Sequence, residues 1–594
     1  MAQRVKNLLA AIGGLFLAVL LVLGAVSVYW LMDKPAPAEI ILEVDLDREF
    51  IEYIPNDPIA MTALGGKQRV RDFVEALERA ADDDRVTGMI ARVGKGAQRL
   101  GTLQELRNAI FAFRESGKPA IAYADTIGEG AAGNASYYLA TAFDEVYVQP
   151  GGLVALTGLG VDRPFLSGAL ETVGIAPRFD TREEYKTAPN MFTEPGYTQA
   201  HREQDAAILM AQFAQFTQGI SDGRGLSEDA ARNLVAHGPF QAATAAEAGL
   251  IDGLKYRDEA YDRIRELAGE NGELLYLGRY LQRTGRLHDQ GPRVALIHAS
   301  GLLMRGPNGF DPLLGEITMG AETVAKAFRD AMNDDEVAAI LFRIDSPGGS
   351  VVGSESIHRE VNRAREKGIP VIAAMGGVAA SGGYYVAMGA DHIVAQPATV
   401  TGSIGVYTGK PVFTNAFWER LRVNWDGLQT SDNAGLWSPL HDVTSTQQER
   451  VAELLDGWYE QFTSNVAEHR GMAPGAAAEW AKGRVFMGEE ALDLGLVDSM
   501  GGYPEAIRVA RELAGLAEDE PIEIKEFPPP KSLDTMLLEL FVGKPPEHSE
   551  EPAASTRALR EYVERTREMG RLLRELGVVS PGGAYYAPVP QAIR

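Results

Sequence analysis

The 594-residue sequence contains no cysteine, and this absence removes several kinds of chemistry at once. Without thiols the chain has no disulfide bonds, no Cys-ligated zinc and no cysteine nucleophile. Histidine is also scarce: the chain has nine, and their positions show no sequence signature of a catalytic triad. Any covalent catalysis must therefore use a nucleophile other than cysteine.

Basic residues are also fewer than acidic residues. The chain has 57 Lys and Arg against 82 Asp and Glu, which leaves a formal net charge of -25. Affinity for phosphate groups depends on a basic surface, so we expect no nucleic-acid partner. The hydrophobic content of 45% excludes disorder across the whole chain, and the length predicts roughly three to four domains.

One long hydrophobic run lies near the N-terminus. Leu8–Met32 contains no charged residue, Arg4 and Lys6 precede it, and a charged pair follows it. The run is long enough to span a bilayer. Ala36-Pro-Ala38 resembles a signal-peptidase site, but the apolar region of a cleaved signal peptide is usually only ~7–15 residues long. We expect residues 1–34 to be a cytoplasmic tip and a single transmembrane anchor, with the acidic body on the far side of the membrane.

The chain also contains an internal duplication, with an offset of about 250 residues. Matching blocks follow one another in the same order in both copies. The paired segments are Asp84–Val93 with Asp335–Ile344, Gly117–Ala122 with Gly368–Ala373, and Ala248–Asp252 with Leu494–Asp498. Four such blocks in one order, including one around the Tyr-Tyr pairs at 137 and 384, are improbable by chance.

Each copy alternates short apolar runs with amphipathic segments, which predicts parallel βαβ units and an α/β fold. The expected strands include 89–93 and 340–344, and the expected helices include 103–115 and 354–366. We expect the first repeat to cover residues 39–285 and the second 291–516. Residues 517–594 are expected to form a Pro-containing tail with one helix, over 556–576.

A duplicated enzyme needs only one working set of chemical groups, so positions where the copies differ are informative. Ser381 precedes Gly-Gly and an Ala-rich segment, whereas the first copy has Asn134 at this place. Conversely, Lys186 in the first copy aligns with Ala434 in the second. The first copy would then supply a base and the second a nucleophile. Taken singly, Ser381 could be an ordinary helix N-cap, and a loop lysine is usually a solvated charge.

Acyl transfer also needs donors for an oxyanion. The segment Arg343-Ile-Asp-Ser-Pro-Gly-Gly349 ends an apolar run with a turn, and the first copy lacks its Pro-Gly-Gly. The amides of Gly349 and Gly382 are the candidate donors, although the turn could simply connect a strand to a helix. Ser403, in Thr-Gly-Ser-Ile-Gly, could hold the lysine amine or be a turn serine.

These motifs together resemble the signal peptide peptidase A family in its long, duplicated form, a family of membrane-bound Ser/Lys proteases. The resemblance covers nearly the whole chain and implies a ClpP/crotonase-like fold in each half. It also implies a homotetramer at the inner membrane, with its catalytic body in the periplasm, that cuts signal peptides and other unstructured apolar peptides. Carried over, Ser381 is the nucleophile, Lys186 the base, Ser403 its orienting hydroxyl, and Gly349 and Gly382 the oxyanion donors. No cofactor or metal is expected.

Two other functions are compatible with such a fold. A crotonase-type acyl-CoA enzyme would share the glycine-rich turns, but it would not require a serine beside Gly-Gly. A noncatalytic membrane scaffold with a degenerate protease fold need not retain both Ser381 and Lys186.

Overall fold

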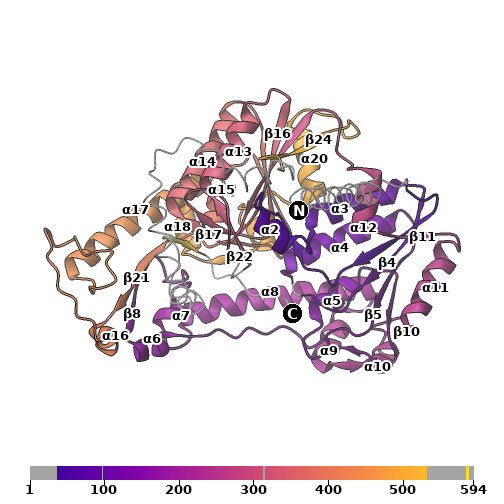
Figure 1. The fold of residues 1–594 in the computed structure, drawn as a ribbon, viewed down its shortest axis with the longest axis horizontal. Coiled ribbons are helices and arrows are strands. Elements are labelled where there is room, and N and C mark those ends of the chain that lie inside the picture. The colour runs from indigo at the N-terminus through magenta and orange to yellow at the C-terminus, as the bar shows by residue number, and fades with distance from the viewer. Residues whose placement is uncertain (1–35, 97, 312–314, 531–583, 587–594) are drawn as a thin grey trace, which may run out of the picture.

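The computed structural model describes residues 36–96, 98–311, 315–530 and 584–586 (Figure 1). The expected anchor and the helix expected at 556–576 lie outside these residues. Within the described part of the chain, no helix is both long and apolar enough to cross a membrane.

The first half of the chain forms a six-stranded sheet in which all neighbouring strands are parallel. Its strand order is β10-β6-β5-β4-β1-β11. The strands are β1 (Ile40–Asp45), β4 (Val86–Arg92), β5 (Ala120–Ala124), β6 (Glu145–Val148), β10 (Gly253–Leu254) and β11 (Glu273–Tyr276). Every residue of β5 is buried, which is typical of a parallel sheet covered by helices on both faces.

The second half repeats this arrangement, with the equivalent order β23-β19-β18-β16-β12-β24. These strands are β12 (Arg293–Ser300), β16 (Val337–Ser346), β18 (Val371–Ala380), β19 (His392–Ala395), β23 (Ser499–Met500) and β24 (Glu523–Phe527). Two further strands, β20 (Val400–Gly402) and β22 (Val485–Met487), extend the sheet beside β18. The expected end of the second repeat at residue 516 is too early, because β24 pairs with β12.

The two sheets share one irregularity as well as their strand order. The pairing of β1 with β4 shifts register between Ile40 and Ile41, and that of β12 with β16 shifts between Arg293 and Val294. The predicted helices are present as α4 (Leu100–Glu115) and α14 (Val351–Glu366), and the predicted strands as β4 and β16. The mixed α/β fold with parallel sheets is therefore confirmed.

The halves differ where strands lead toward helices. β18 continues to Ala380 and connects through Ser381 to α15 (Gly382–Ala387), whereas β5 ends at Ala124 and a loop precedes α5 (Asn134–Ala140). The longer strand delivers a residue of the second half to the carboxyl edge of its sheet.

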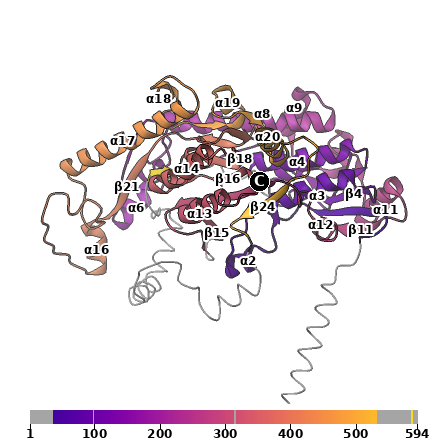
Figure 2. The same ribbon diagram turned by 90° about the horizontal axis from the view of Figure 1, so that it is seen from above.

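A third sheet joins the two halves. β8 (Ile175–Thr181) of the first half pairs antiparallel with β21 (Tyr407–Phe413) of the second along seven residues. Figures 1 and 2 both show this pair at one end of the molecule, with helix α6 (Ser167–Val173) and α16 (Asn415–Leu421) beside it. The pairing carries the segment that follows β8 into the second half.

A buried arginine also fastens the halves together. Arg343 on β16 is fully buried, and its guanidinium donates to Glu52 at 2.7 Å and to Glu105 at 2.6 Å. Both carboxylates belong to the first half, and the ring of Tyr503 lies 4.4 Å from the guanidinium carbon. Burial raises the pKa of Glu52 to about 7, against the opposing effect of Arg343.

This cluster predicts a large effect on stability. Glu105→Ala would leave a buried guanidinium with one carboxylate fewer, and we expect the free energy of unfolding to fall by about 3–5 kcal/mol. Glu453 is the control, because its ion pair with Arg450 is exposed on both sides, and its loss should cost less than about 1 kcal/mol. Urea denaturation of both variants measures this, and equal small losses would contradict a linking role for Arg343.

Candidate active site

Ser381 stands at the junction of β18 and α15, in a conformation that L residues rarely adopt. Its φ is 57° and its ψ is -119°, and its side chain makes no capping hydrogen bond. The backbone holds it in place, because its N–H donates to the carbonyl of Gly402 at 2.7 Å and its carbonyl accepts from Tyr385 N–H at 2.8 Å. The alternative of an ordinary N-cap serine is therefore wrong.

Lys186 reaches Ser381 from the other half of the same chain. It lies in the loop between β8 and α7 (Asn190–Thr193) and is only 1% exposed. Its Nζ lies 2.8 Å from Ser381 Oγ, and it also lies 2.9 Å from both the hydroxyl and the carbonyl oxygen of Ser403. The structure thus brings the predicted serine, lysine and second serine into one hydrogen-bonded group.

An uncharged lysine can satisfy all three oxygens that surround its amine. The Ser403 carbonyl can only accept, so the amine donates one hydrogen to it and a second to Ser403 Oγ. A neutral amine then has a lone pair left for the hydroxyl hydrogen of Ser381. Ser403 itself is fully buried and has a φ of 52°, which turns the chain at the end of β20.

Burial changes the acidity of this lysine. Desolvation lowers the pKa of Lys186 well below its usual value, because a charged amine loses its water without gaining a counter-ion. Among the described residues, no carboxylate forms an ion pair with it.

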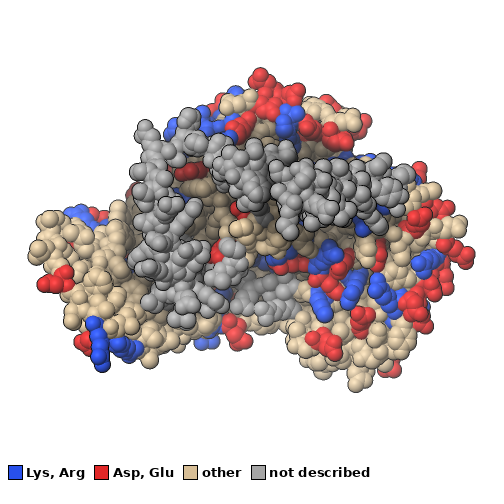
Figure 3. All heavy atoms as spheres, viewed as in Figure 1, with Lys and Arg blue, Asp and Glu red and all other residues tan. Residues whose placement is uncertain are grey.

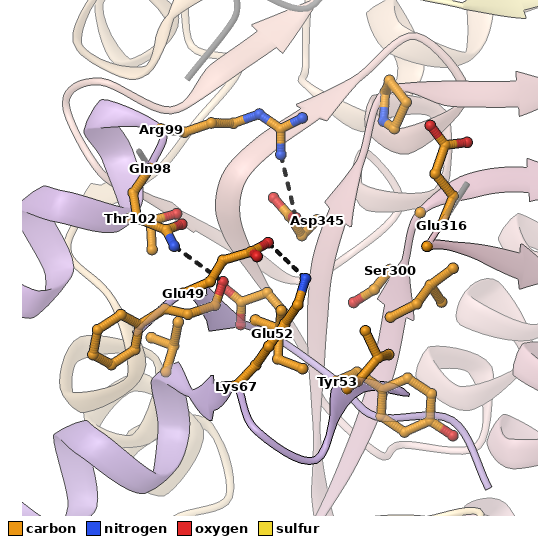
Figure 4. Close-up of a pocket in the computed structure, with 18 of the residues that line it drawn as sticks. Glu49, Glu52, Tyr53, Lys67, Gln98, Arg99, Thr102, Ser300, Glu316 and Asp345 are labelled. Atoms are coloured by element: carbon orange, nitrogen blue, oxygen red, sulfur yellow. Dashed lines mark hydrogen bonds and ion pairs between the residues drawn. The ribbon is translucent and has the colours of Figure 1, made fainter. Parts of the chain in front are cut away.

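A second lysine shows the contrast. Lys67 lines a separate polar cavity of about 530 Å³ between the two halves. Its Nζ points to Glu49 at 2.8 Å, while Arg99 faces Asp345 across the same cavity at 3.6 Å (Figure 4). Lys67 thus has a carboxylate partner, whereas the amine of Lys186 contacts only hydroxyl and carbonyl oxygens among the residues that the structure describes.

The two predicted oxyanion donors lie together. A Cβ atom on Gly382 would stand 3.1 Å from the amide nitrogen of Gly349. Gly382 begins α15, so its N–H has no partner within the helix. Gly349 has a φ of 151°, and a Cβ there would meet the carbonyl oxygen of Leu303 at 2.1 Å, so no other residue fits this turn.

Sequence reasoning missed the residues that support the lysine loop. Gly483, with a φ of 78°, packs so closely that a Cβ on it would lie 2.6 Å from Lys186 N. Gln204 on the long helix α8 (Gln199–Arg224) donates to Thr187 Oγ1 at 3.5 Å and accepts from Val485 N–H at 3.0 Å. No motif marks these residues, since their role depends on segments that are far apart in the chain.

The position aligned with Ser381 in the first copy and the position aligned with Lys186 in the second copy carry neither a hydroxyl nor an amine. Asn134 is 2% exposed, and its amide group donates to Gly158 O at 2.8 Å and accepts from Thr157 N–H at 3.1 Å. Ala434 lies in an exposed loop. Only one such serine and lysine pair therefore occurs at the aligned positions.

Comparison with known proteins identifies relatives that align with more than three quarters of the chain. Residues 112–271 and 363–517 match Peptidase family S49. Protease 4 of Haemophilus influenzae is 29% identical over 492 residues, covering 78% of this chain and 77% of that protein. The chloroplastic serine protease SPPA of Arabidopsis thaliana is 30% identical over 481 residues, covering 79% and 69%.

Solved structures give only a weak likeness. A point mutant of ClpP1 from Listeria monocytogenes has a TM-score of 0.23 and 15% identity, and the match covers 36% of this chain and 94% of that one.

The packing of Gly483 can be tested against a matched glycine. Gly483→Ala should push the Lys186 loop away from Ser381, and a shift of about 1 Å at a reacting group can cost about 10²-fold in rate. Gly475→Ala is the control, because its φ of 80° is similar and no atom lies within 4 Å of the added Cβ. Labelling of Ser381 by a fluorophosphonate, followed by mass spectrometry, should slow in Gly483→Ala only. Equal slowing in both variants would mean that the contact with Lys186 is unimportant.

Proposed function

This chain belongs to peptidase family S49 and is a serine protease of the Protease 4 type, and we propose that Ser381 and Lys186 are its catalytic dyad. One observation carries the proposal: a fully buried lysine, which has no carboxylate partner in the described part of the chain, has its amine 2.8 Å from the serine hydroxyl. A general base must be within hydrogen-bond reach of the proton it removes and must be unprotonated at the working pH.

In the first half of the reaction, the neutral amine of Lys186 takes the hydroxyl proton of Ser381 as Oγ attacks the scissile carbonyl carbon. The C–O π electrons move to the oxygen and form an oxyanion. The amides of Gly349 and Gly382 donate to this oxygen, which stabilises the charge as it develops. Ser403 accepts two hydrogens of the amine and so keeps the lone pair directed at Ser381.

In the second half, the protonated Lys186 gives its proton to the leaving nitrogen, and the C–N bond breaks. The acyl group stays on Ser381 as an ester. Lys186, again neutral, takes a proton from the water that attacks the ester carbonyl carbon. It then gives this proton to Ser381 Oγ as the ester C–O bond breaks, which releases the carboxyl product and restores the serine hydroxyl and the neutral amine. No cofactor or metal enters any of these steps.

The proposal extends to fold, assembly and location. Each half would be a ClpP/crotonase-like unit, the first over residues 39–285 and the second from residue 291 to the end of β24, and the identical strand order of the two sheets supports this. Residues 8–32 would anchor the chain in the inner membrane, with the catalytic body in the periplasm as part of a homotetramer. On the face shown in Figure 3, basic and acidic side chains of the described residues are interspersed, which does not favour a nucleic-acid partner.

The proposed substrates are signal peptides and other unstructured apolar peptides at the membrane. The relatives named as proteases support peptide substrates. Because Ser381 and Lys186 are both buried, only a chain that can be drawn out as an extended segment would reach them. A tightly folded protein would therefore resist cleavage.

Substitutions at Ser381 and at Asn134, its aligned position in the first copy, should show which of the two positions is needed for activity. Ser381→Ala should abolish hydrolysis of an unfolded apolar peptide, because the nucleophilic oxygen is lost. Asn134→Ala should stay within a few-fold of wild type, since Asn134 holds the backbone of the first half at Thr157 and Gly158. The assay measures kcat/KM on the peptide, with a tightly folded protein as the resistant control. A loss in Asn134→Ala as large as in Ser381→Ala would refute a single site.

The lysine predicts a specific pH dependence. Because burial lowers the pKa of Lys186, the active neutral form should predominate at pH values well below the ~10.4 of free lysine. The value of kcat/KM should rise with pH through one ionisation and then level off. Lys186→Arg should stay inactive, because guanidinium remains protonated.

Stability provides the control for this prediction. The unfolded chain binds a proton on Lys186 that the folded chain does not, so folding is opposed at neutral pH and this cost falls as the pH rises. Lys186→Met should thus be inactive but at least as resistant to urea as wild type at pH 7. A Lys186→Met enzyme that is active, or one that is unfolded, would count against the assignment.

A further inference from the structure

The polar cavity that contains Lys67 lies between the carboxyl ends of equivalent strands of the two halves. Its lining includes residues that follow β1 and β4 in the first half, and residues at or just after the ends of β12 and β16 in the second. Ligands of α/β proteins commonly bind outside the carboxyl ends of the strands. The volume of about 530 Å³ also lies within the range of ligand sites.

Negative charge predominates in this cavity. Its lining contains two cations, Lys67 and Arg99, and four carboxylates, those of Glu49, Glu52, Glu316 and Asp345. Lys67 is paired closely with Glu49, at 2.8 Å. Arg99 Nη1, however, lies 3.6 Å from Asp345 Oδ2, which is beyond hydrogen-bond distance, and Glu316 forms no ion pair with any described residue. The cavity therefore lacks positive charge.

Two of these carboxylates, Glu52 and Asp345, lie close together. A Cβ atom on Gly376 would stand 3.0 Å from Glu52 Oε1 and 3.1 Å from Asp345 Oδ1, so one small group could contact both. Burial raises the pKa of Glu52 to about 7, and the charges of Glu105 and Asp345 act in the same direction. A cation beside the two carboxylates would offset their repulsion.

Ser300 is independent evidence for a ligand. It is the last residue of β12 and is only 8% exposed, yet its Oγ has no hydrogen-bond partner among the described residues. Figure 4 shows this oxygen pointing toward the middle of the labelled side chains. A buried hydroxyl without a partner destabilises the fold, and a ligand that donates to Ser300 Oγ would remove this penalty.

The cavity also adjoins the proposed active site. Pro347 lines it and stands two residues before Gly349, a proposed oxyanion donor. β13 (Leu302–Met304) begins at the cavity and pairs through Leu303 with Gly349 on β17 (Gly348–Ser350). An extended peptide advances about 3.3 Å per residue, so a side chain roughly two to five residues from the cut bond would reach the cavity.

We propose that this cavity binds the ammonium or guanidinium group of a lysine or arginine side chain in the peptide substrate. The cation would lie between Glu52 and Asp345 and donate to Ser300 Oγ, while Arg99, which contacts Asp345 only loosely, turns toward solvent. The inference rests on the proposed function and deepens it, because a signal peptide carries a positively charged region directly before its apolar run. Apolar peptides with a basic residue would then be preferred over neutral ones.

Kinetics on matched peptides test this preference. A quenched apolar peptide carries one lysine, placed in turn at each position around the cut bond, and its counterpart carries acetyl-lysine, which is neutral. At the best position kcat/KM should be about tenfold higher for lysine, because hydrogen bonds to charged groups are strong.

Substitutions in the cavity should remove the advantage of lysine. Asp345→Asn, which keeps an oxygen for the N–H of Val378, and Ser300→Ala should each reduce it to about threefold or less. Glu322→Gln is the matched control, because Glu322 is exposed and lies outside the cavity, and it should keep the full advantage. A preference for lysine that survives both cavity substitutions would overturn the inference.

Binding without turnover separates this inference from the proposed function. In the Ser381→Ala background, a fluorescent lysine peptide should bind about tenfold more tightly than its acetyl-lysine counterpart, and Asp345→Asn should remove the difference. If the difference appears but the wild type hydrolyses neither peptide, the proposed function fails and the cavity site stands. If the wild type cuts both peptides equally at every lysine position, the inference is overturned. Binding of putrescine, a free diamine, without any preference for the lysine peptide would assign the cavity to free amines and would also overturn it.

Discussion

The burial of one lysine amine among hydroxyl and carbonyl oxygens is the constraint on which the rest of the site depends. An amine removed from water without a carboxylate loses its proton readily, and Lys186 is in that position. The fold must therefore supply oxygens that hold the amine without charging it, and both oxygens of Ser403 do so. A single carboxylate beside Lys186 would stabilise the ammonium form and remove the proposed base.

Keeping such a lysine buried requires a rigid junction, because the amine comes from the first half and the hydroxyl from the second. Two features provide it. The β8–β21 pairing brings the lysine loop to the second half, and Arg343 binds Glu52 and Glu105 beside the strand that precedes the turn at Gly349. Within the described residues, the buried carboxylates of this junction face the guanidinium, and no carboxylate forms an ion pair with the amine.

Duplication explains why each half could lose part of the chemistry. The two sheets keep the same strand order and the same register shift, so the scaffold is repeated faithfully. The differences lie at the carboxyl ends of strands, where side chains do not support the core. Asn134 illustrates this, because its amide now fastens a loop at the place where the second half has Ser381.

The sequence by itself determined the repeat, the alternating strands and helices, and the chemical asymmetry between Ser381 and Lys186. These depend on local periodicity and on comparison of one copy with the other, and both can be read along the chain. The end of the second repeat was misjudged, because β24 is a short strand whose partner, β12, lies more than two hundred residues earlier. Only the tertiary structure decided that the amine meets the hydroxyl within one chain and that Gly483 and Gln204 support the lysine loop. Those contacts join residues far apart in sequence, and no local pattern encodes a distance in space.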